Sequence, residues 1–518
     1  MNTFNTAAPA ERMPRQIGYI IGNEGCERFS FYGMRNILTP FLITSLLMYL
    51  PAADRPGAAK DIFHTFVIGV YFFPLLGGWL ADRWLGKYRT VLWLSLIYCV
   101  GHACLAIFER SVAGFYTGLA LIALGSGGIK PCVASFVGDQ FTARNRHLAR
   151  IVFDAFYWII NVGSFFASLL MPLFLRHYGA AVAFGIPGVL MFVATIVFWM
   201  GRHQYVMLPP VAHDPDSFAR VVRTALTARA PGEGRPGLVV AFVGLLAAVA
   251  SLALIPVLGV VPAVCLAFVA TLAGVGSGAR MQLDRAQGGH PERAIEGVRV
   301  VLRMLVVFAL VTPFWSLFDQ KASTWIVQAG EMDFPSWLHP AQMQAINPAL
   351  VLLLIPFNNL AVFPFLRRLG YEPTALRRMT AGIGFAALAW VAVGSIQLAI
   401  DGGDPVSIFW QLLPYVLLTS GEVLVSATGL EFAYSQAPPS MKGTLMSFWT
   451  LSVTVGNLWV LLANAGVRNV TVLGYIQNTG ISTSAFQMFF FAAFAGVAAV
   501  AFGWYARRYR VVDNYRAA

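Results

Sequence analysis

Hydrophobic residues recur along the chain in long runs, and short polar segments separate the runs. An α-helix rises 1.5 Å per residue, so about 20 apolar residues in a row cross the hydrocarbon core of a bilayer. The pattern therefore predicts an all-α polytopic membrane protein with fourteen transmembrane helices. The predicted spans are 17–49, 62–81, 90–108, 113–136, 150–175, 181–200, 238–256, 259–278, 299–328, 343–366, 379–399, 406–435, 444–466 and 485–505.

The first predicted span differs from the others because it carries four charged side chains, Glu24, Glu27, Arg28 and Arg35. A charge at the bilayer centre costs roughly 2.5–3.5 kcal/mol on insertion scales, so four on one helix must pair or face water. Helical spacing places all four on one face, with Glu24 and Arg28 one turn apart. Because ionisable groups within membranes mark proton and ion pathways, we expect this helix to handle protons or ions. A structural ion-pair cluster that only orients the helix is the alternative.

Composition and charge support a membrane protein and argue against nucleic-acid binding. Hydrophobic residues make up 58% of the 518 residues and charged residues 12%, which excludes a soluble globular domain. The net charge is +12, but 27 Lys and Arg residues lie in alternate loops on one side, five on the other and four within spans. The positive-inside rule then predicts two cytoplasmic termini and anionic lipid as the partner of the basic loops. The charges in the first apolar run also argue against a cleavable signal peptide.

The chain shows no sign of catalytic or cofactor chemistry. Its five cysteines fall within predicted spans and lack CxxC or metal-ligand spacing. No glycine-rich phosphate loop, Walker motif or nucleophile elbow is present. We therefore expect no enzyme activity, metal or cofactor, and an energy source other than ATP.

Two basic loops half a chain apart indicate duplicated halves. GGWLADRWLGKYRT (77–90) follows the second span, and FLRRLGYEPTALRR (365–378) follows the tenth with Gly370 at the corresponding turn. The first loop resembles the loop motif of the major facilitator superfamily, in which two six-helix bundles rock about a central site. The two surplus spans form a charge-free hairpin at 238–278. The predicted domains are an N-terminal six-helix bundle (1–202), cytoplasmic linkers with the inserted hairpin (203–297), and a C-terminal six-helix bundle (298–518).

Further segments resemble one family within that superfamily. GIKPCVASFVGDQF (128–141) and FDAFYWIINVGS (153–164) are similar to the two signatures of the proton-dependent oligopeptide transporter family. NEGCERFSFYGMR (23–35) matches the family's Glu-x-x-Glu-Arg pattern. PFWSLFDQKASTW (313–325) and GEVLVSATGLEFAYSQAPPSMKG (421–443) resemble its seventh and tenth core helices. The resemblance covers essentially the whole chain in the correct order, so the chain is identified as a member of this family.

The resemblance implies proton-coupled symport of di- and tripeptides into the cytoplasm by alternating access, in a bacterial inner (plasma) membrane, with a monomer sufficient for transport. Arg35 and Lys130 are cations suited to a peptide carboxylate, and Glu422 is an acid suited to a peptide ammonium. The residues expected to bind substrate are Arg35, Tyr32, Tyr71, Lys130, Asn161, Trp315, Asn347, Glu422, Ser426 and Trp449.

Proton coupling needs a carboxylate whose proton affinity changes when a cation approaches. The residues that the resemblance implies for this role are Glu24, Glu27, Arg28, Asp319 and His64. It also implies two gate pairs, Arg35 with Asp319 outside and Lys130 with Glu422 inside. Protonation of Asp319 would then release Arg35 and favour the outward-open state.

Two departures from the family pattern and two alternatives stay open at this point. Phe31 stands where many members have tyrosine, and Lys321 stands where they usually have glutamine, with no partner evident from the sequence.

A proton-coupled carrier of the same fold for nitrate, an amino acid or another small anion is the main alternative. Glu422 argues against it, because an anion site needs no acid for an ammonium. A peptide receptor would need an output domain, and the longest candidate, 203–236, is too short and polar.

Overall fold

The computed structural model describes residues 13–141, 147–210, 215–229, 234–436, 441–509 and 511. In this part of the chain the regular structure is helical, and extended pairing is limited to the isolated bridges Gln287–His290 and Asp333–Ser407. The all-α class predicted from the hydrophobic runs is confirmed. Both chain ends, which were predicted to be cytoplasmic, lie outside the described residues, and so do the side chains of Phe153 and Asp154 in the second signature.

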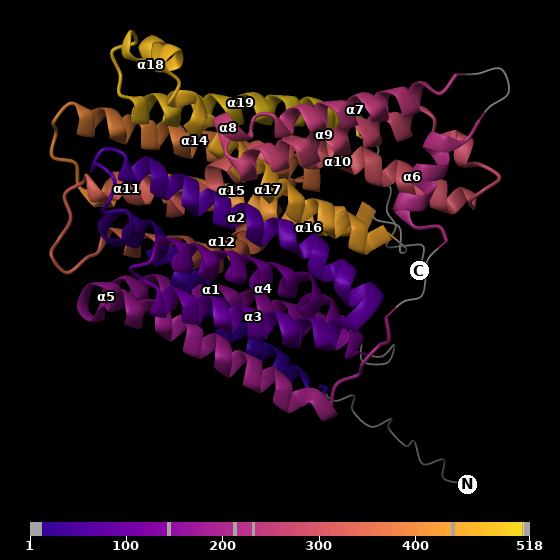
Figure 1. Ribbon diagram of the computed structural model, residues 1–518, viewed down its shortest axis with the longest axis horizontal. Helices are drawn as coiled ribbons and strands as arrows, with labels where there is room; N and C mark the ends of the chain where they lie inside the picture. The colour runs from indigo at the N-terminus through magenta and orange to yellow at the C-terminus, as the bar shows by residue number, and fades with distance from the viewer. Residues whose placement is uncertain are drawn as a thin grey trace. The chain divides into compact units, whose positions relative to one another are not determined.

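The helices divide into two compact units, which we describe separately. The first unit comprises Met1–Ile37 and Phe73–Ala212. In Figure 1 its helices run in colour from indigo to magenta, a range that they share with α2 (Arg55–Leu80). They are α1 (Ile17–Phe41, up to residue 37), α3 (Lys87–Ile107), α4 (Val112–Asp139) and α5 (His147–Met200). α3 packs against both α4 and α5, and α5 contains two predicted spans that meet at Gly179, where φ is 81°.

The second unit comprises Leu38–Phe72 and His213–Ala518. Its helices are α2 (Arg55–Leu80, up to residue 72), α6 (Phe218–Thr227), α7 (Pro236–Leu252), α8 (Ile255–Leu258), α9 (Val260–Met281), α10 (Glu292–Phe318), α11 (Thr324–Gly330), α12 (Ile346–Phe357), α13 (Phe363–Arg368), α14 (Ala375–Asp401), α15 (Leu412–Glu422), α16 (Thr428–Gln436), α17 (Lys442–Val467), α18 (Val470–Gln477) and α19 (Thr483–Arg508). The domain boundaries 1–202, 203–297 and 298–518 are not tested by this division and stay a prediction.

Eleven helical segments among the described residues are long and apolar enough to cross a membrane. The predicted count of fourteen is therefore not exact by this measure, for physical reasons. The charges on α1 lower its hydropathy, and α7 has only 17 residues. The segment Ala155–His203 holds two predicted spans, which Gly179 separates without a connecting loop.

Several predicted continuous spans are interrupted in the structure, among them the one at 343–366, where a π-helical turn, Asn358–Val362, separates α12 from α13. The span predicted at 299–328 is broken by a 3-10 turn, Asp319–Ala322, between α10 and α11. The span predicted at 406–435 is broken by a π-helical turn, Val423–Ala427, between α15 and α16. Hydrophobic periodicity does not reveal such breaks, because a few residues of altered winding leave the apolar run intact. Breaks of this kind redirect side chains and are frequent at functional sites.

Each of the two basic loops contains a glycine with a positive φ. Gly86 has φ of 74° and Gly370 has φ of 77°, a region that residues with a Cβ rarely adopt. In the first loop, Lys87 Nζ also lies 2.6 Å from Asp139 Oδ2 at the end of α4. The agreement between the two glycines supports the duplication inferred from the sequence.

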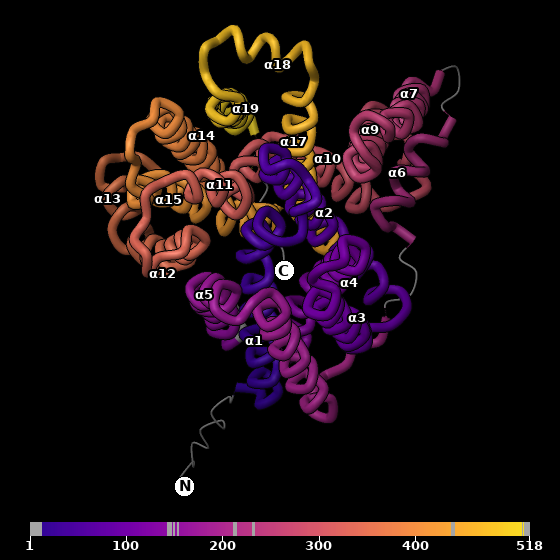
Figure 2. The backbone as a smooth tube through the Cα atoms, turned by 60° about the vertical axis from the view of Figure 1, so that its left-hand side comes forward, coloured from indigo at the N-terminus to yellow at the C-terminus, as the bar shows by residue number. Residues whose placement is uncertain are grey.

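The inserted hairpin is held together by glycine contacts between α7 and α9, which run side by side (Figure 2). A Cβ on Gly244 would lie 2.5 Å from the Cα of Gly274, and a Cβ on Gly237 would lie 2.2 Å from the carbonyl oxygen of Gly278. Only glycine permits this approach, which replaces side-chain packing by backbone contact. Phe242, on the same hairpin, is 58% exposed, as expected for a surface in contact with lipid.

A buried aromatic core stabilises the second unit around its broken helices. Trp325 of α11 meets Tyr415 of α15 edge to face, with 4.9 Å between ring centroids, and also contacts Trp390 of α14. Phe491 of α19 packs against Trp390. Aromatic rings bury large apolar areas with defined geometry, so this core fixes the helices that carry the site described next.

Candidate functional site

A charged cluster lies inside the first unit on α1. Arg28 Nε lies 3.0 Å from Glu24 Oε1 and 2.5 Å from Glu27 Oε2. Ser126 of α4 donates a hydrogen bond of 3.5 Å to Glu27 Oε1. All of these side chains are buried. The Arg28 guanidinium therefore compensates the charges of two carboxylates. The Glu24–Arg28 pairing expected from helical spacing is present. That this cluster handles protons stays a prediction.

Lys130 of α4 lies over an aromatic face of the same unit. Its Nζ is 4.5 Å from the ring centroid of Phe31, and Arg28 Cζ is 5.9 Å from the same centroid. Phenylalanine at this position lacks the hydroxyl group that tyrosine would offer, but its ring still attracts the two cations. Tyr32 packs edge to face against Phe31.

The other predicted polar residues of the first unit have different surroundings. Arg35 is buried on α1. Asn161 of α5 is also buried, and its side-chain amide donates to the carbonyl oxygen of Tyr157 at 2.9 Å.

In the second unit, an amide links His64 to Asp319. Asn457 of α17 donates from Nδ2 to Asp319 Oδ2 at 2.8 Å and to the carbonyl oxygen of Val453 at 2.9 Å. Its Oδ1 lies 2.6 Å from His64 Nδ1, and His64 Nε2 lies 2.9 Å from Ser323 Oγ. Since Nδ2 donates, Oδ1 must accept, so the network assigns a proton to His64 Nδ1.

This network was only partly predicted from the sequence. His64 and Asp319 were candidates, but Asn457 and Ser323 were not. Asn457 lies 393 residues from His64, so no spacing connects them. The available signal was the presence of asparagine side chains, Asn457 and Asn464, in a strongly apolar span, because polar groups at membrane depth are costly unless they have partners.

A second amide links Lys321 to Glu422, also within the second unit. Lys321 Nζ donates to Asn347 Oδ1 at 2.8 Å. Asn347 Nδ2 donates to Glu422 Oε2 at 2.5 Å and to Thr419 Oγ1 at 3.0 Å. These contacts join the 3-10 turn 319–322, α12 and α15. They provide the partner of Lys321 that the sequence left open.

Two tryptophans predicted to bind substrate pack against each other in the second unit. Trp315 of α10 and Trp449 of α17 meet edge to face with 6.0 Å between ring centroids. A Cβ on Gly429 would lie 2.2 Å from Trp449 Cη2, so glycine there leaves room for the indole. Ser426 lies half-buried on the π-helical turn after Glu422, and Tyr71 lies on α2 against the core of this unit.

Each predicted gate pair has one member in each unit. Arg35 and Lys130 belong to the first unit, and Asp319 and Glu422 belong to the second. The pairing of Arg35 with Asp319 and of Lys130 with Glu422 stays a prediction.

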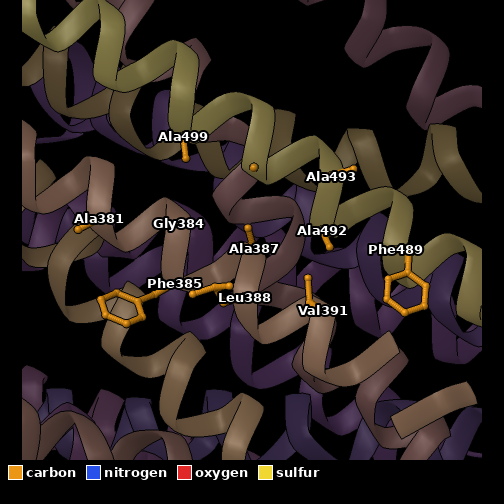
Figure 3. Close-up of a pocket in the computed structure, with 11 residues that line it drawn as sticks. Ala381, Gly384, Phe385, Ala387, Leu388, Val391, Phe489, Ala492, Ala493 and Ala499 are labelled. Atoms are coloured by element: carbon orange, nitrogen blue, oxygen red, sulfur yellow. The ribbon is translucent and has the colours of Figure 1, made fainter. Parts of the chain in front are cut away.

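The pocket in Figure 3 is an apolar groove between α14 and α19, with a volume of about 690 Å³. It is lined by Ala381, Gly384, Phe385, Ala387, Leu388, Val391, Phe489, Ala492, Ala493, Gly496 and Ala499. Without a charged or hydrogen-bonding side chain in its lining, it offers nothing to recognise a charged ligand. In the described part of the chain, no three His, Cys, Asp or Glu side chains gather as a metal site would require.

Comparison with known proteins decides the family. The family model PTR2, described as POT family, matches residues 88–480. The chain belongs to the POT family. A crystal structure of an auto-inhibited POT family peptide transporter has 66% sequence identity and a TM-score of 0.95, with 97% of this chain and 98% of that chain covered. The in meso crystal structure of the POT family transporter PepTSo has 64% identity and a TM-score of 0.95, covering 97% and 100%.

Among curated proteins, solute carrier family 15 member 2 of Mus musculus is 33% identical over 438 residues, which cover 80% of this chain and 54% of that protein. The chain thus spans about half the length of the curated relatives it matches. Membership in the POT family, together with the eleven helical segments of the described residues that are suited to cross a membrane, makes this a multi-pass integral membrane protein of a transporter family. The family and the major facilitator fold class inferred from the sequence motifs are confirmed.

The charged cluster of α1 yields a stability prediction. Arg28→Met leaves Glu24 and Glu27 buried without their guanidinium, and breaking a buried ion pair costs about 3–5 kcal/mol. We expect a clearly lower thermal unfolding midpoint in detergent, measured by intrinsic fluorescence. Arg110→Met is the matched control, because the Arg110 side chain is 94% exposed and its loss should change little. Equal midpoints for both variants would contradict a compensating role for Arg28.

Proposed function

We propose that this chain is a proton-coupled symporter that carries di- and tripeptides into the cytoplasm by alternating access. The observation that carries the proposal is the near-complete match, at 66% identity, to a POT family peptide transporter of known structure. The charged and amide networks supply chemistry that suits this function.

Peptides of different sequence share an ammonium and a carboxylate, so a carrier of many peptides must bind these ends. Arg35 and Lys130 of the first unit are suited to the carboxylate. Glu422 of the second unit, with Asn347 beside it, is suited to the ammonium. The aromatic side chains Tyr32, Tyr71, Trp315 and Trp449 would leave room for variable side chains between the two ends, and Asn161 and Ser426 would add hydrogen bonds.

Proton coupling requires that protonation change which groups are paired. Two networks suit this role, the Glu24–Arg28–Glu27 cluster of α1 and the His64–Asn457–Asp319 chain of the second unit. In our proposal, protonation of Asp319 releases Arg35 at the outer gate, and Lys130 pairs with Glu422 at the inner gate.

The proposed setting is a bacterial inner membrane with both termini in the cytoplasm, because Lys and Arg concentrate in alternate loops. The proton gradient would drive transport without a cofactor or catalytic activity, and a monomer would suffice. A carrier of nitrate or another small anion is less favoured, because the Glu422 carboxylate would repel an anion rather than bind it.

Uptake into proteoliposomes tests the proposal directly. Labelled dialanine should accumulate when an inward proton gradient is imposed, and an uncoupler should reduce uptake to equilibration. Empty liposomes give the background. If dialanine does not enter above that background, peptide transport is wrong; if it enters equally with and without the gradient, proton coupling is wrong.

The amide bridge of Asn457 yields a coupling prediction. Asn457→Leu removes hydrogen bonds to Asp319 and His64, and a hydrogen bond to a charged group contributes roughly 1.5–3 kcal/mol. We therefore expect gradient-driven dialanine uptake to fall about tenfold or more, with counterflow exchange affected less. Ser447→Ala on the same helix is the control, because this exposed hydroxyl bonds only locally to the Gly443 carbonyl oxygen. Undiminished gradient-driven uptake in the leucine variant would rule out this bridge in coupling.

Glu422 yields a substrate prediction. If its carboxylate binds the peptide ammonium, free dialanine should compete with labelled dialanine far better than N-acetyl-dialanine does. Glu422→Gln keeps the shape but removes the charge, so it should lose most of this discrimination, which we measure as the ratio of the two half-inhibitory concentrations. Equal competition by both compounds in the unaltered protein would exclude Glu422 from ammonium binding.

A further inference from the structure

The position of Lys321 calls for a function, because a lysine is rarely buried at membrane depth. Lys321 lies on the 3-10 turn 319–322 and is 5% exposed. Its Nζ lies 3.3 Å from the ring centroid of Phe318 and donates to Asn347 Oδ1 at 2.8 Å. The ammonium is therefore held between an aromatic face and an amide oxygen, and it points toward α12.

Both N–H groups of the Asn347 amide and its oxygen have hydrogen-bond partners. Its oxygen accepts from Lys321, and its nitrogen donates to Glu422 at 2.5 Å and to Thr419 at 3.0 Å. Rotation of the amide by 180° would turn the NH₂ group toward an ammonium and the oxygen toward a carboxylate. Both contacts would then be repulsive, so charges at both ends fix the orientation of the amide.

A lysine at position 321 restricts the orientation of the Asn347 amide. An ammonium only donates hydrogen bonds, so it can face the Asn347 oxygen but not its NH₂ group. A glutamine at position 321 could donate or accept, so the orientation of Asn347 would then depend on Glu422 alone. Only the orientation observed here presents an N–H to Glu422 and holds its carboxylate on the side of α12.

We propose that Lys321 is a positioning residue for substrate binding: by fixing the Asn347 amide, it holds the Glu422 carboxylate where the peptide ammonium binds. This inference rests on the proposed peptide transport. It assigns Lys321 an indirect action through Asn347, so its effect should concern recognition of the ammonium and should depend on Asn347.

The test compares Lys321→Met with the unaltered protein in proteoliposomes. Methionine keeps the length of the side chain but has no charge and no donor. The readout is the discrimination ratio, the half-inhibitory concentration of N-acetyl-dialanine divided by that of dialanine. We expect the ratio to fall about tenfold, because the carboxylate loses a fixed amide partner. Lys442→Met, at the start of α17, is the matched control and should keep the ratio.

Dependence on Asn347 separates positioning from general structural support. In an Asn347→Leu background, Lys321→Met should produce no further fall in the ratio, because the connection to Glu422 is already lost. Loss of a merely structural lysine would instead lower dialanine uptake, leave the ratio unchanged and act similarly in either background. If Lys321→Met does not fold, Lys321→Gln replaces it in the test. We expect Lys321→Gln to lower the discrimination ratio about threefold.

Each outcome supports or overturns a specific claim. A fall in the ratio with Lys321→Met that disappears in the Asn347→Leu background supports positioning. Another outcome is that the unaltered protein transports dialanine and discriminates it from N-acetyl-dialanine while the lysine variants keep the same discrimination ratio. In that case the positioning role is wrong and the proposed function stands. An additive fall in the double variant overturns the action through Asn347. Absence of dialanine transport by the unaltered protein overturns the proposed function itself.

Discussion

The cost of an unpartnered charge in a medium without water constrains the interior of this protein more than any other interaction. A charge at the bilayer centre costs roughly 2.5–3.5 kcal/mol on insertion scales, and breaking a buried pair costs about 3–5 kcal/mol. The chain meets this constraint inside each unit. Arg28 lies between two glutamates of its own helix, and in the second unit Asp319 and Glu422 accept hydrogen bonds from asparagine amides.

In the second unit, each of two asparagine amides connects a pair of ionisable side chains. Asn457 connects His64 with Asp319, and Asn347 connects Lys321 with Glu422. An amide offers a donor on one side and an acceptor on the other, so it can transmit the orientation of one ionisable group to another. A proton gained or a substrate bound at one end would therefore be felt at the other end.

The 3-10 turn 319–322 separates the two networks. Asp319 and Lys321 are only two residues apart, yet Asp319 is bound by Asn457 of α17 and Lys321 bonds to Asn347 of α12. A turn with about three residues per turn directs side chains two positions apart to different sides. An acid and a base that are near neighbours in the sequence thus serve two separate networks.

The sequence by itself determined the local features of this protein. Apolar runs predicted the helices, and the i,i+4 spacing predicted the pairing of Glu24 with Arg28, because both depend on residues close along one chain segment. The motifs determined the family. Tertiary structure alone decided where the helices break, which amide joins His64 to Asp319 across 393 residues, and which partner Lys321 has. These features depend on which helices pack together, and a buried polar group obtains its partner only from that packing.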